Sequence, residues 1–365
     1  MRKSALCIVA VGAAAAVAIA GCSSSKKSST GSTGSASGKP VVGVILPDTT
    51  TSNRYTLYDQ PLLQQAFDAA GVKATIQNAH GSTDTFVSDA QAMITQGVKV
   101  LLIDPADPAT GITVEKAASS AGVQVIDYDR VNLGGSAKYY VSFDNEKVGE
   151  LQAQGLLTCL SAKGVNSNPN IIELNGGTDI DNNAVLFKAG AHTIWTQKGV
   201  TPKVEQDVKG WDNTVAATDF QQAFTQDPSV QGVLAANDGI AAAAITTLKQ
   251  HHLQVPVTGQ DATVQGIQYI LTGDQCLTVF KDVKQEAAAA SKLAIALAKG
   301  QPATSAGLTF SSFQDPKGNR TLQAVLLTPE IITKANVKDV ITAGALTATQ
   351  ICAGIQAACT AAGIS

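Results

Sequence analysis

The 365-residue sequence lacks the short motifs that identify several classes of enzyme. It contains no glycine-rich phosphate loop, no nucleophile elbow and no HExxH metal motif. No stretch interleaves basic and aromatic residues as nucleic-acid-binding surfaces do. We therefore expect neither an enzyme nor a protein that binds nucleic acid, and no cofactor.

Charged residues are scarce, at 15%, and the 29 acidic residues slightly outnumber the 26 basic ones. Such a low content of charge favours a compact globular chain over a disordered one. The length exceeds that of a typical single domain and is sufficient for two.

The N-terminus has the pattern of a secretory signal. Arg2 and Lys3 precede an apolar stretch at 7–20, and the small residues of AIAGCSSS lead to Cys22. This arrangement resembles a bacterial lipobox, which predicts a signal peptide at 1–21 and acylation of Cys22; a plain signal peptide with an incidental cysteine is the alternative. Residues 22–39 then form a flexible Ser/Gly-rich tether. The folded part is expected at the outer face of the cytoplasmic membrane, held there by lipid.

Four cysteines remain in the expected mature chain: Cys159, Cys276, Cys352 and Cys359. An oxidising exterior allows disulfides to persist, and four cysteines permit three pairings. The favoured pairing joins Cys352 to Cys359 in a short local loop and Cys159 to Cys276. No CxxC pair is present, so no metal site is expected.

From residue 41 onward, short runs of Val, Ile and Leu alternate with stretches of helical character. The expected strands are 41–46, 74–79, 98–104, 123–128, 138–144, 170–175, 203–208, 232–238, 255–261, 276–281, 307–310 and 322–327. The expected helices are 57–70, 83–96, 109–121, 146–161, 182–198, 213–226, 239–251, 263–272 and 282–299. Continuous apolar strands between helices are typical of parallel sheets covered on both faces.

Polar residues stand where nearly every expected strand ends. These are Asp104, Asp129-Arg130, Asn175, Asn237-Asp238, Gln260-Asp261 and Lys281. In open parallel sheets, ligands bind beyond the carboxyl ends of the strands. Two such sheets facing each other would form a polar cleft.

Several stretches carry a resemblance to a known family. They are YDR (128–130), SFDNEKVGELQA (142–153), DNNAVLFKAG (181–190), GW (210–211), AAND (235–238), GQDATVQGI (259–267), TVFK (278–281) and LLTP (326–329). In this order and spacing the chain resembles the periplasmic sugar-binding proteins of ABC transporters, of the ribose, galactose and xylose type, and among them the xylose-binding members most. The similarity runs from about residue 41 to 329.

The resemblance implies an α/β fold of two doubly wound parallel-sheet domains joined by a three-strand hinge, the type I periplasmic binding protein clamshell. The N-terminal sugar-binding domain would comprise 40–146 and 282–308. The C-terminal domain would comprise 147–281 and 309–365.

The resemblance also implies a sugar pocket, carried over position by position. Its residues would be Arg54, Tyr55, Asp129, Arg130, Asp181, Asn183, Trp211, Asn237, Asp261 and Lys281. Asp129 and Arg130 are expected to neutralise one another, and Tyr55 and Trp211 to cover a sugar face. The first loop, PDTTTSNRYTLYD, is longer than the family pattern and carries tyrosine where a tryptophan is expected.

The implied function is capture of a monosaccharide, an aldopentose and foremost D-xylose, by a monomeric receptor that delivers it to an ABC permease. One alternative is a sensor that presents the sugar to a membrane kinase. Another is a receptor for a different pentose, a hexose or a polyol. A sugar-responsive transcription regulator is disfavoured, since a signal and tether occupy the place of a helix-turn-helix.

Overall fold

The computed structural model describes residues 41–49, 52 and 54–364. The expected signal peptide, Cys22 and the tether lie outside the described residues. Among the helices of the described ranges, none has both the length and the apolar character that crossing a membrane requires.

Seven strands form the first sheet, in the order β10-β11-β5-β4-β3-β1-β2. They are β1 (Val42–Leu46), β2 (Ala74–Asn78), β3 (Val100–Ile103), β4 (Gln124–Tyr128), β5 (Tyr139–Phe143), β10 (Ser311–Asp315) and β11 (Arg320–Leu327). All neighbours pair in parallel except β10 and β11, which are antiparallel.

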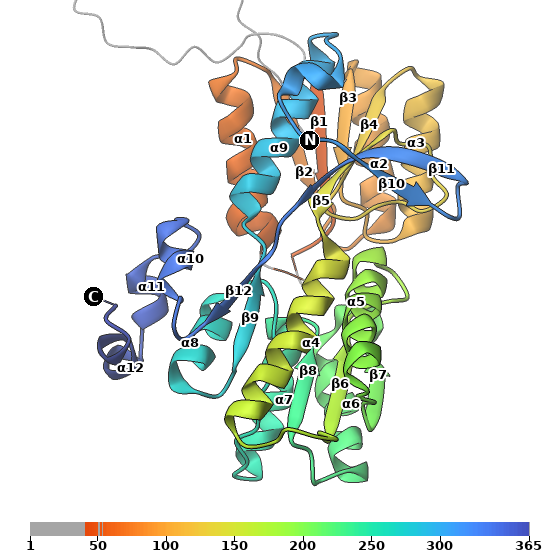
Figure 1. The fold of residues 1–365 in the computed structure, drawn as a ribbon. Helices are drawn as coiled ribbons and strands as arrows, with labels where there is room; N and C mark the ends of the chain where they lie inside the picture. The colour runs from red at the N-terminus through yellow and green to blue at the C-terminus, as the bar shows by residue number, and fades with distance from the viewer. Residues whose placement is uncertain (1–40, 50–51, 53, 365) are drawn as a thin grey trace, which may run out of the picture. The chain divides into compact units, whose positions relative to one another are not determined.

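Helices cover both faces of this sheet (Figure 1). One face is covered by α1 (Gln60–Ala69) and α9 (Val283–Ala298), and the other by α2 (Thr83–Gln96) and α3 (Pro108–Ser120). Two short helical turns adjoin the first pair: η1 (Tyr55–Asp59) lies next to α1, and η3 (Ala303–Ala306) lies next to α9. Val42 and Val44 of β1 pack with α1 and α9, whereas Ile45 packs with α2 and α3. Because alternate side chains of β1 pack into the apolar clusters on the two faces of the sheet, the strand is apolar throughout.

The second sheet contains β6 (Ile171–Asn175), β7 (Val204–Asp207) and β8 (Gly232–Ala235) in the order β7-β6-β8. A separate pair, β9 (Leu277–Phe280) and β12 (Glu330–Thr333), is antiparallel. Single parallel bridges, Val233 to Val257 and Gln260 to Val279, link the two groups. The strand predicted at 255–261 is thus reduced to bridges; Pro256 within it lacks the N–H that a ladder needs.

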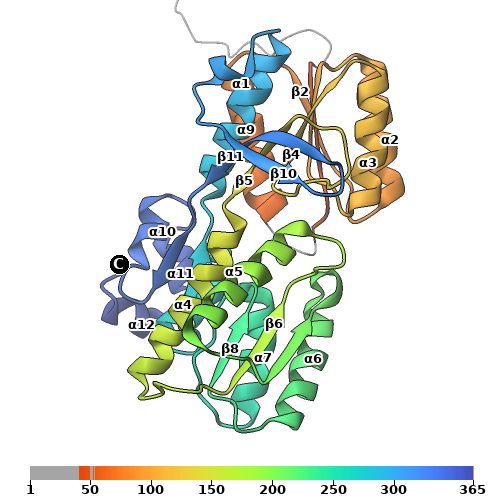
Figure 2. The same ribbon diagram turned by 45° about the vertical axis from the view of Figure 1, so that its right-hand side comes forward.

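The second sheet also has helices on both faces (Figure 2). They are α4 (Asn145–Ala162), α5 (Asn182–Lys198), α6 (Asn213–Gln226), α7 (Asp238–Gln250) and α8 (Val264–Thr272), with the short turn η2 (Lys209–Trp211) before α6. Helices α4 and α5 approach closely because of Gly149 and Gly190. A Cβ atom on either residue would collide with the backbone of the other helix.

The chain passes between the first sheet and the second three times: after β5, after β9 and after β11. We call residues 41–143 and 282–327 the N-lobe and residues 144–281 and 328–364 the C-lobe. The predicted division assigned all of 309–365 to the C-terminal domain, and the sheet order corrects this for β10 and β11. Strand β11 pairs in parallel with β5 and so extends the first sheet. The predicted strand at 307–310 is likewise displaced to β10.

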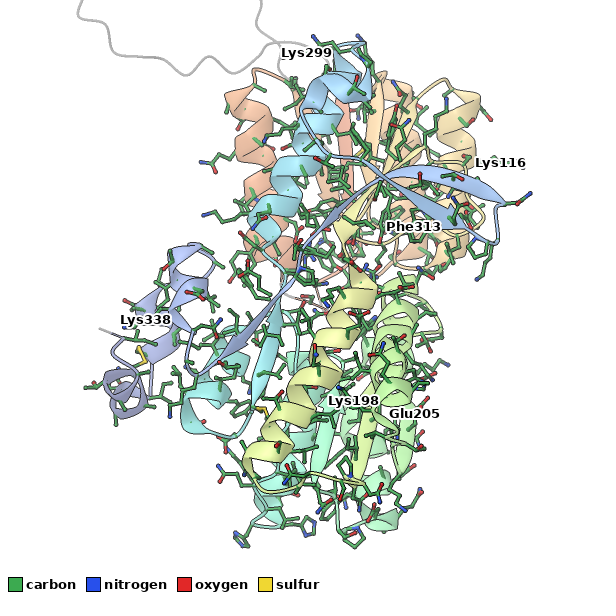
Figure 3. All side chains as sticks on the ribbon, in the orientation of Figure 1. Lys116, Lys198, Glu205, Lys299, Phe313 and Lys338 are labelled. Atoms are coloured by element: carbon green, nitrogen blue, oxygen red, sulfur yellow. A yellow bond between two sulfur atoms is a disulfide. The ribbon has the colours of Figure 1, made fainter. Side chains whose placement is uncertain are left out.

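The end of the chain packs against α8. Helices α10 (Lys338–Thr342), α11 (Ala348–Cys352) and α12 (Gln356–Ala361) share an apolar cluster with Ile267 and Ile270. The Cys352–Cys359 disulfide closes this segment, near Lys338 in Figure 3. A second disulfide joins Cys159 of α4 to Cys276 beside β9. Both bonds follow the pairing favoured from the sequence.

Candidate functional site

One cavity is lined by residues of both lobes. It encloses about 370 Å³ not filled by protein atoms, part of it open to solvent. All ten residues nominated from the sequence line it, together with Ser52, Phe187 and Gln260.

The cavity lies where strands end and helices begin. Asp129 and Arg130 directly follow β4, Asn237 follows β8 by one residue, and Lys281 directly follows β9. Other lining residues stand at the start of helical segments. Arg54 and Tyr55 open η1, Asp181 and Asn183 open α5, and Trp211 lies in η2 just before α6. The polar residues predicted at strand ends are therefore only partly gathered here, since Asp104, Asn175 and Asp238 are not among the lining residues.

Arg54 is held by three carboxylates. Its Nε and Nη2 donate to the two carboxylate oxygens of Asp59 at 2.9 and 2.8 Å. Nη2 also donates to Glu286 at 2.6 Å, and Nη1 donates to Asp129 at 3.2 Å. Burial lowers the pKa of Arg54, but the negative charges of Asp129, Asp59 and Glu286 outweigh it and raise the pKa well above its ordinary value. The guanidinium is fixed in place, with one edge directed at the cavity.

Glu286, on α9 behind Arg54, is fully buried. Burial raises its pKa to about 8; Arg54 opposes this effect, and the negative Asp129 and Asp59 reinforce it. A second buried acid, Asp104, has its pKa raised well above the usual value by burial first and by Asp129 next. Glu286 and Asp104 are thus harder to ionise than Asp129, which lines the cavity.

Asp129 has a left-handed backbone conformation, with φ of 58°, which aspartate tolerates better than most residues. Its side chain accepts from Arg54 at 3.2 Å and from the Tyr55 hydroxyl at 3.3 Å. Its backbone oxygen accepts from Ser142 and Asn183 at 2.8 and 2.9 Å. Burial raises the pKa of Asp129, but Arg54, Lys281 and Arg130 lower it below its ordinary value. Asp129 is therefore an ionised acceptor.

Asp129 and Arg130 do not form the mutual pair expected from the sequence. Arg130 Nε instead lies 3.2 Å from Asp181 Oδ2 of the C-lobe and 3.8 Å from Asp104, while Asp129 faces Arg54. The turn at Asp129 separates the two adjacent side chains, so each finds a partner distant in sequence.

Asp181 organises the start of α5. Its Oδ1 accepts from the Asn183 backbone N–H at 2.8 Å, which caps the helix. Its Oδ2 accepts from Trp211 Nε1 at 3.1 Å and faces Arg130. Asn183 is bound in turn by Asn145, whose Nδ2 donates to Asn183 Oδ1 at 2.8 Å. One carboxylate thereby fixes a helix end, an indole and a guanidinium.

Aromatic rings form the apolar part of the lining. The Trp211 ring packs over Gly176 and Gly177, where a Cβ atom would intrude on it. It meets Phe187 edge to face, with centroids 6.3 Å apart. Trp211 also belongs to the C-lobe core, so the ring both packs in that core and lines the cavity.

Asn237 both caps a helix and lines the cavity. Its Oδ1 accepts from Ile240 N–H at 2.9 Å at the start of α7, which leaves its NH₂ group and one Oδ1 lone pair for a ligand. The neighbouring Asp238 is buried and accepts from Thr263, Gln275 and Thr278. Burial raises its pKa to about 6, against the lowering effect of those hydrogen bonds. Asp238 therefore has a structural role.

Comparisons with known proteins address the class of this site. A model of the periplasmic binding protein domain matches residues 42–302. The chain belongs to the periplasmic binding protein family.

Three relatives illustrate its place in this family. The D-xylose-binding periplasmic protein of Escherichia coli K12 is 33% identical over 290 residues, covering 78% of this chain and 84% of the relative. The multiple sugar-binding periplasmic receptor ChvE of Rhizobium radiobacter is 32% identical over 330 residues, covering 85% and 91%. The crystal structure of a carbohydrate transporter solute binding protein from Chloroflexus aurantiacus, in complex with D-glucose, matches with a TM-score of 0.75, 28% identity, and coverage of 85% of this chain and 98% of the other.

The family predicted from the sequence motifs, that of the sugar-binding proteins of ABC transporters, is confirmed. The type I periplasmic binding protein fold is confirmed as well. The protein is a substrate-binding protein and not an enzyme.

Several residues at or behind the cavity of this periplasmic binding protein were not among those nominated for the sugar pocket. Phe187 lies four residues after Asn183 on α5, so helical spacing could have placed both on the cavity side. Gln260 stands beside Asp261 at an expected strand end. Glu286 and Asp59 gave no signal, because only the fold brings them to Arg54.

Proposed function

We propose that this periplasmic binding protein captures a monosaccharide, foremost D-xylose, in the cavity and delivers it to an ABC permease. The observation that carries the proposal is the charge-balanced lining of the cavity. Three carboxylates and three cations line it: Asp129, Asp181, Asp261, Arg54, Arg130 and Lys281. Since ion pairs join members of the two sets, the lining suits an uncharged polar ligand better than an ion.

The hydroxyl groups of a sugar can form hydrogen bonds with both the acidic and the basic side chains of the lining. Carboxylates such as Asp129 and Asp261 accept hydroxyl hydrogens, while Arg130, Lys281 and Asn237 donate to hydroxyl oxygens. Hydrogen bonds to charged partners are roughly twice as strong as those between neutral groups. The lining therefore offers donors and acceptors together, as a ring of hydroxyl groups requires.

The aromatic side chains support the same ligand class. A pyranose has apolar C–H faces, and Trp211 and Phe187 offer apolar surface beside the charged rim. Tyr55 also lines the cavity, but its hydroxyl is engaged with Asp129. We assign the covering of the sugar face to Trp211 first.

Closure of the two lobes would couple binding to transport. In the structure, lobe-to-lobe contacts already run through cavity residues, from Arg130 to Asp181 and from Asn183 to the Asp129 backbone. A sugar held by both lobes adds contacts that exist only in the closed form, and so shifts the population toward it. The closed form would be the one recognised by the permease.

D-xylose is the first choice because two relatives at 33% and 30% identity bear that name. Other relatives are named as multiple sugar-binding, and one structural neighbour holds D-glucose. A glucose molecule carries a CH₂OH group that xylose lacks, so a hexose needs extra space at one ring carbon.

We further propose that the protein acts as a monomer and is anchored by lipid on Cys22. The support is the lipobox-like AIAGC sequence and the Ser/Gly-rich stretch that follows it. Such an anchor would keep the receptor close to the permease at the outer face of the cytoplasmic membrane.

Calorimetry on soluble protein beginning at Lys39 tests the proposal, with xylose, ribose, arabinose, glucose, galactose and myo-inositol as ligands. We expect 1:1 binding, tightest for xylose. Asp261→Ala should weaken it by about 10- to 100-fold, as loss of a charge-assisted hydrogen bond does. Trp211→Ala should weaken it as well.

Asp219→Ala, on α6, serves as the matched control and should bind like the parent protein. Tighter binding of another sugar would replace xylose but keep the receptor. No binding of any of these ligands by folded protein would contradict the monosaccharide assignment.

A further inference from the structure

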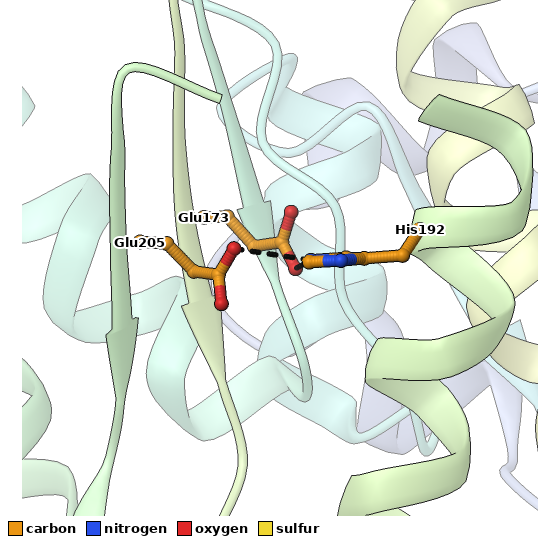
Figure 4. Close-up of side chains that lie close together, drawn as sticks. All are labelled: Glu173, His192 and Glu205. Atoms are coloured by element: carbon orange, nitrogen blue, oxygen red, sulfur yellow. Dashed lines mark ion pairs between the residues drawn. The ribbon is translucent and has the colours of Figure 1, made fainter. Parts of the chain in front are cut away.

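Three metal-ligating side chains meet away from the ligand cavity, on the outer part of the C-lobe. Glu173 comes from β6, His192 from α5 and Glu205 from the edge strand β7 (Figures 3 and 4). His192 Nε2 lies 3.2 Å from Glu173 Oε1 and 3.1 Å from Glu205 Oε2. The three facing atoms all lie within 4.8 Å of one another.

Glu173 occupies a position where an apolar side chain is expected. Strand β6 is buried throughout, and Ile171, two residues earlier on the same face, packs with Ala191 and Ile194 of α5. Glu173 itself is 0% exposed, and its Oε1 has no hydrogen-bond partner among the described residues. Burying a carboxylate in this way is costly unless the charge serves a partner.

Each carboxylate has one oxygen fixed by the protein and the other turned toward His192. Trp195 Nε1 donates to Glu173 Oε2 at 2.6 Å, which leaves Oε1 facing the imidazole. Lys188 Nζ pairs with Glu205 Oε1 at 2.6 Å, which leaves Oε2 on the same side. Donors that hold the outer oxygen of a carboxylate are the usual second layer around a metal ion.

A protonated histidine between two glutamates is the competing explanation. A ring N–H points in one direction and cannot serve two acceptors well. His192 Nε2 is itself a buried atom without a hydrogen-bond partner in the described part of the chain. A central metal ion, in contrast, would be bound by one lone pair from each of the three side chains, all directed at the same point.

The spacing fits a small dication. Zinc binds nitrogen and carboxylate oxygen at about 2.0–2.2 Å in tetrahedral geometry, which places neighbouring ligand atoms about 3.3 Å apart. The distances from His192 Nε2 to the two glutamate oxygens, 3.1 and 3.2 Å, are close to this value. We propose that Glu173, His192 and Glu205 bind a transition-metal dication, with zinc as the best match to one imidazole and two carboxylates.

The location of the site has a structural consequence. The side chains of His192 and Glu205 are 42% and 32% exposed, so the site lies close to the surface, although His192 Nε2 itself is buried. An ion here would fasten α5 to β6 and β7. Helix α5 carries Asp181, Asn183 and Phe187 at the cavity end, so zinc would stiffen the element that presents them without touching the sugar.

Zinc titration of the full-length chain tests the proposal, with detergent-purified protein, a histidine-free tag and a non-chelating buffer. We expect one bound zinc per chain, measured by calorimetry and by elemental analysis after gel filtration, and a higher midpoint of thermal unfolding. His192→Ala and Glu205→Gln should each weaken zinc binding at least tenfold and abolish the rise in the midpoint.

His252→Asn is the matched control, because asparagine tolerates the left-handed φ of 56° at that position. It should leave zinc binding unchanged. Glu205→Gln preserves size at a partly exposed site and keeps the test decisive if His192→Ala folds poorly. Absence of zinc binding by the parent protein, or binding of equal strength in folded Glu205→Gln, would overturn the proposal in favour of a protonated histidine.

Discussion

The two lobes build their walls of the cavity by different means. The N-lobe wall is electrostatic: Arg54 and Asp129 hold each other, and Asp59 and Glu286 stand behind them. The C-lobe wall also carries the charges of Asp181, Asp261 and Lys281, but helix caps and packing hold much of it in place. Asp181 and Asn237 cap α5 and α7, and Trp211 packs over glycines. Charge changes should therefore damage the first wall, and changes of shape or cap the second.

The largest effect is expected from Arg54→Met in the N-lobe. Removing the guanidinium leaves three acids close together with no cation in their centre, and breaking a buried pair this way costs about 3–5 kcal/mol. Urea unfolding measures this loss, and calorimetry should show that sugar binding disappears. Adding Glu286→Gln should restore part of the stability. A loss below about 1 kcal/mol would show that the N-lobe wall does not depend on this charge.

Gly176→Ala should break the C-lobe wall by shape alone. The new methyl group would overlap the Trp211 ring, which must then move away from its position beside Phe187. Overpacking of this kind costs about 1–3 kcal/mol, and sugar affinity should fall with the displaced indole. Unchanged affinity with intact stability would mean that Trp211 is not held by Gly176.

Glu286 should give the N-lobe a pH dependence. Because its folded-state pKa of about 8 lies above the ordinary value of 4.5, the folded protein keeps a proton that the unfolded chain has released. Its contribution to stability therefore falls as pH rises from about 4.5 to about 8, by at most about 1.4 kcal/mol per pH unit, and is level above. Urea midpoints of the parent and Glu286→Gln across pH 5–9 isolate this slope. Parallel curves would contradict it.

A pair of substitutions at Asn237 sharpens the comparison in the C-lobe. Serine caps helices as well as asparagine does, so Asn237→Ser should change stability by only a few tenths of a kcal/mol, while Asn237→Ala should cost about 1 kcal/mol. Both remove the amide NH₂ that faces the cavity and should weaken sugar binding by about 2- to 10-fold. If Asn237→Ser binds as tightly as the parent, the residue is a cap alone.

Sequence reasoning succeeded where the signal is local. Each strand of the first sheet up to β5 was located within about two residues, because continuous apolar runs end at polar residues. All ten nominated site residues line one cavity. The pattern failed for 255–261, where a proline interrupts the ladder of hydrogen bonds. It also did not predict that β10 and β11 belong to the first sheet, because β11 pairs with β5, which is distant in sequence.

The sequence alone determined the alternation of strands and helices, the family, and ten of the residues that line the cavity. These depend on periodicity, caps and motifs within short stretches. Tertiary structure decided the partners of the charges. Arg130 pairs with Asp181 rather than with its neighbour Asp129, and Glu173, His192 and Glu205 meet from three separate elements. Electrostatic interaction depends on distance in space, and only the folded backbone sets that distance.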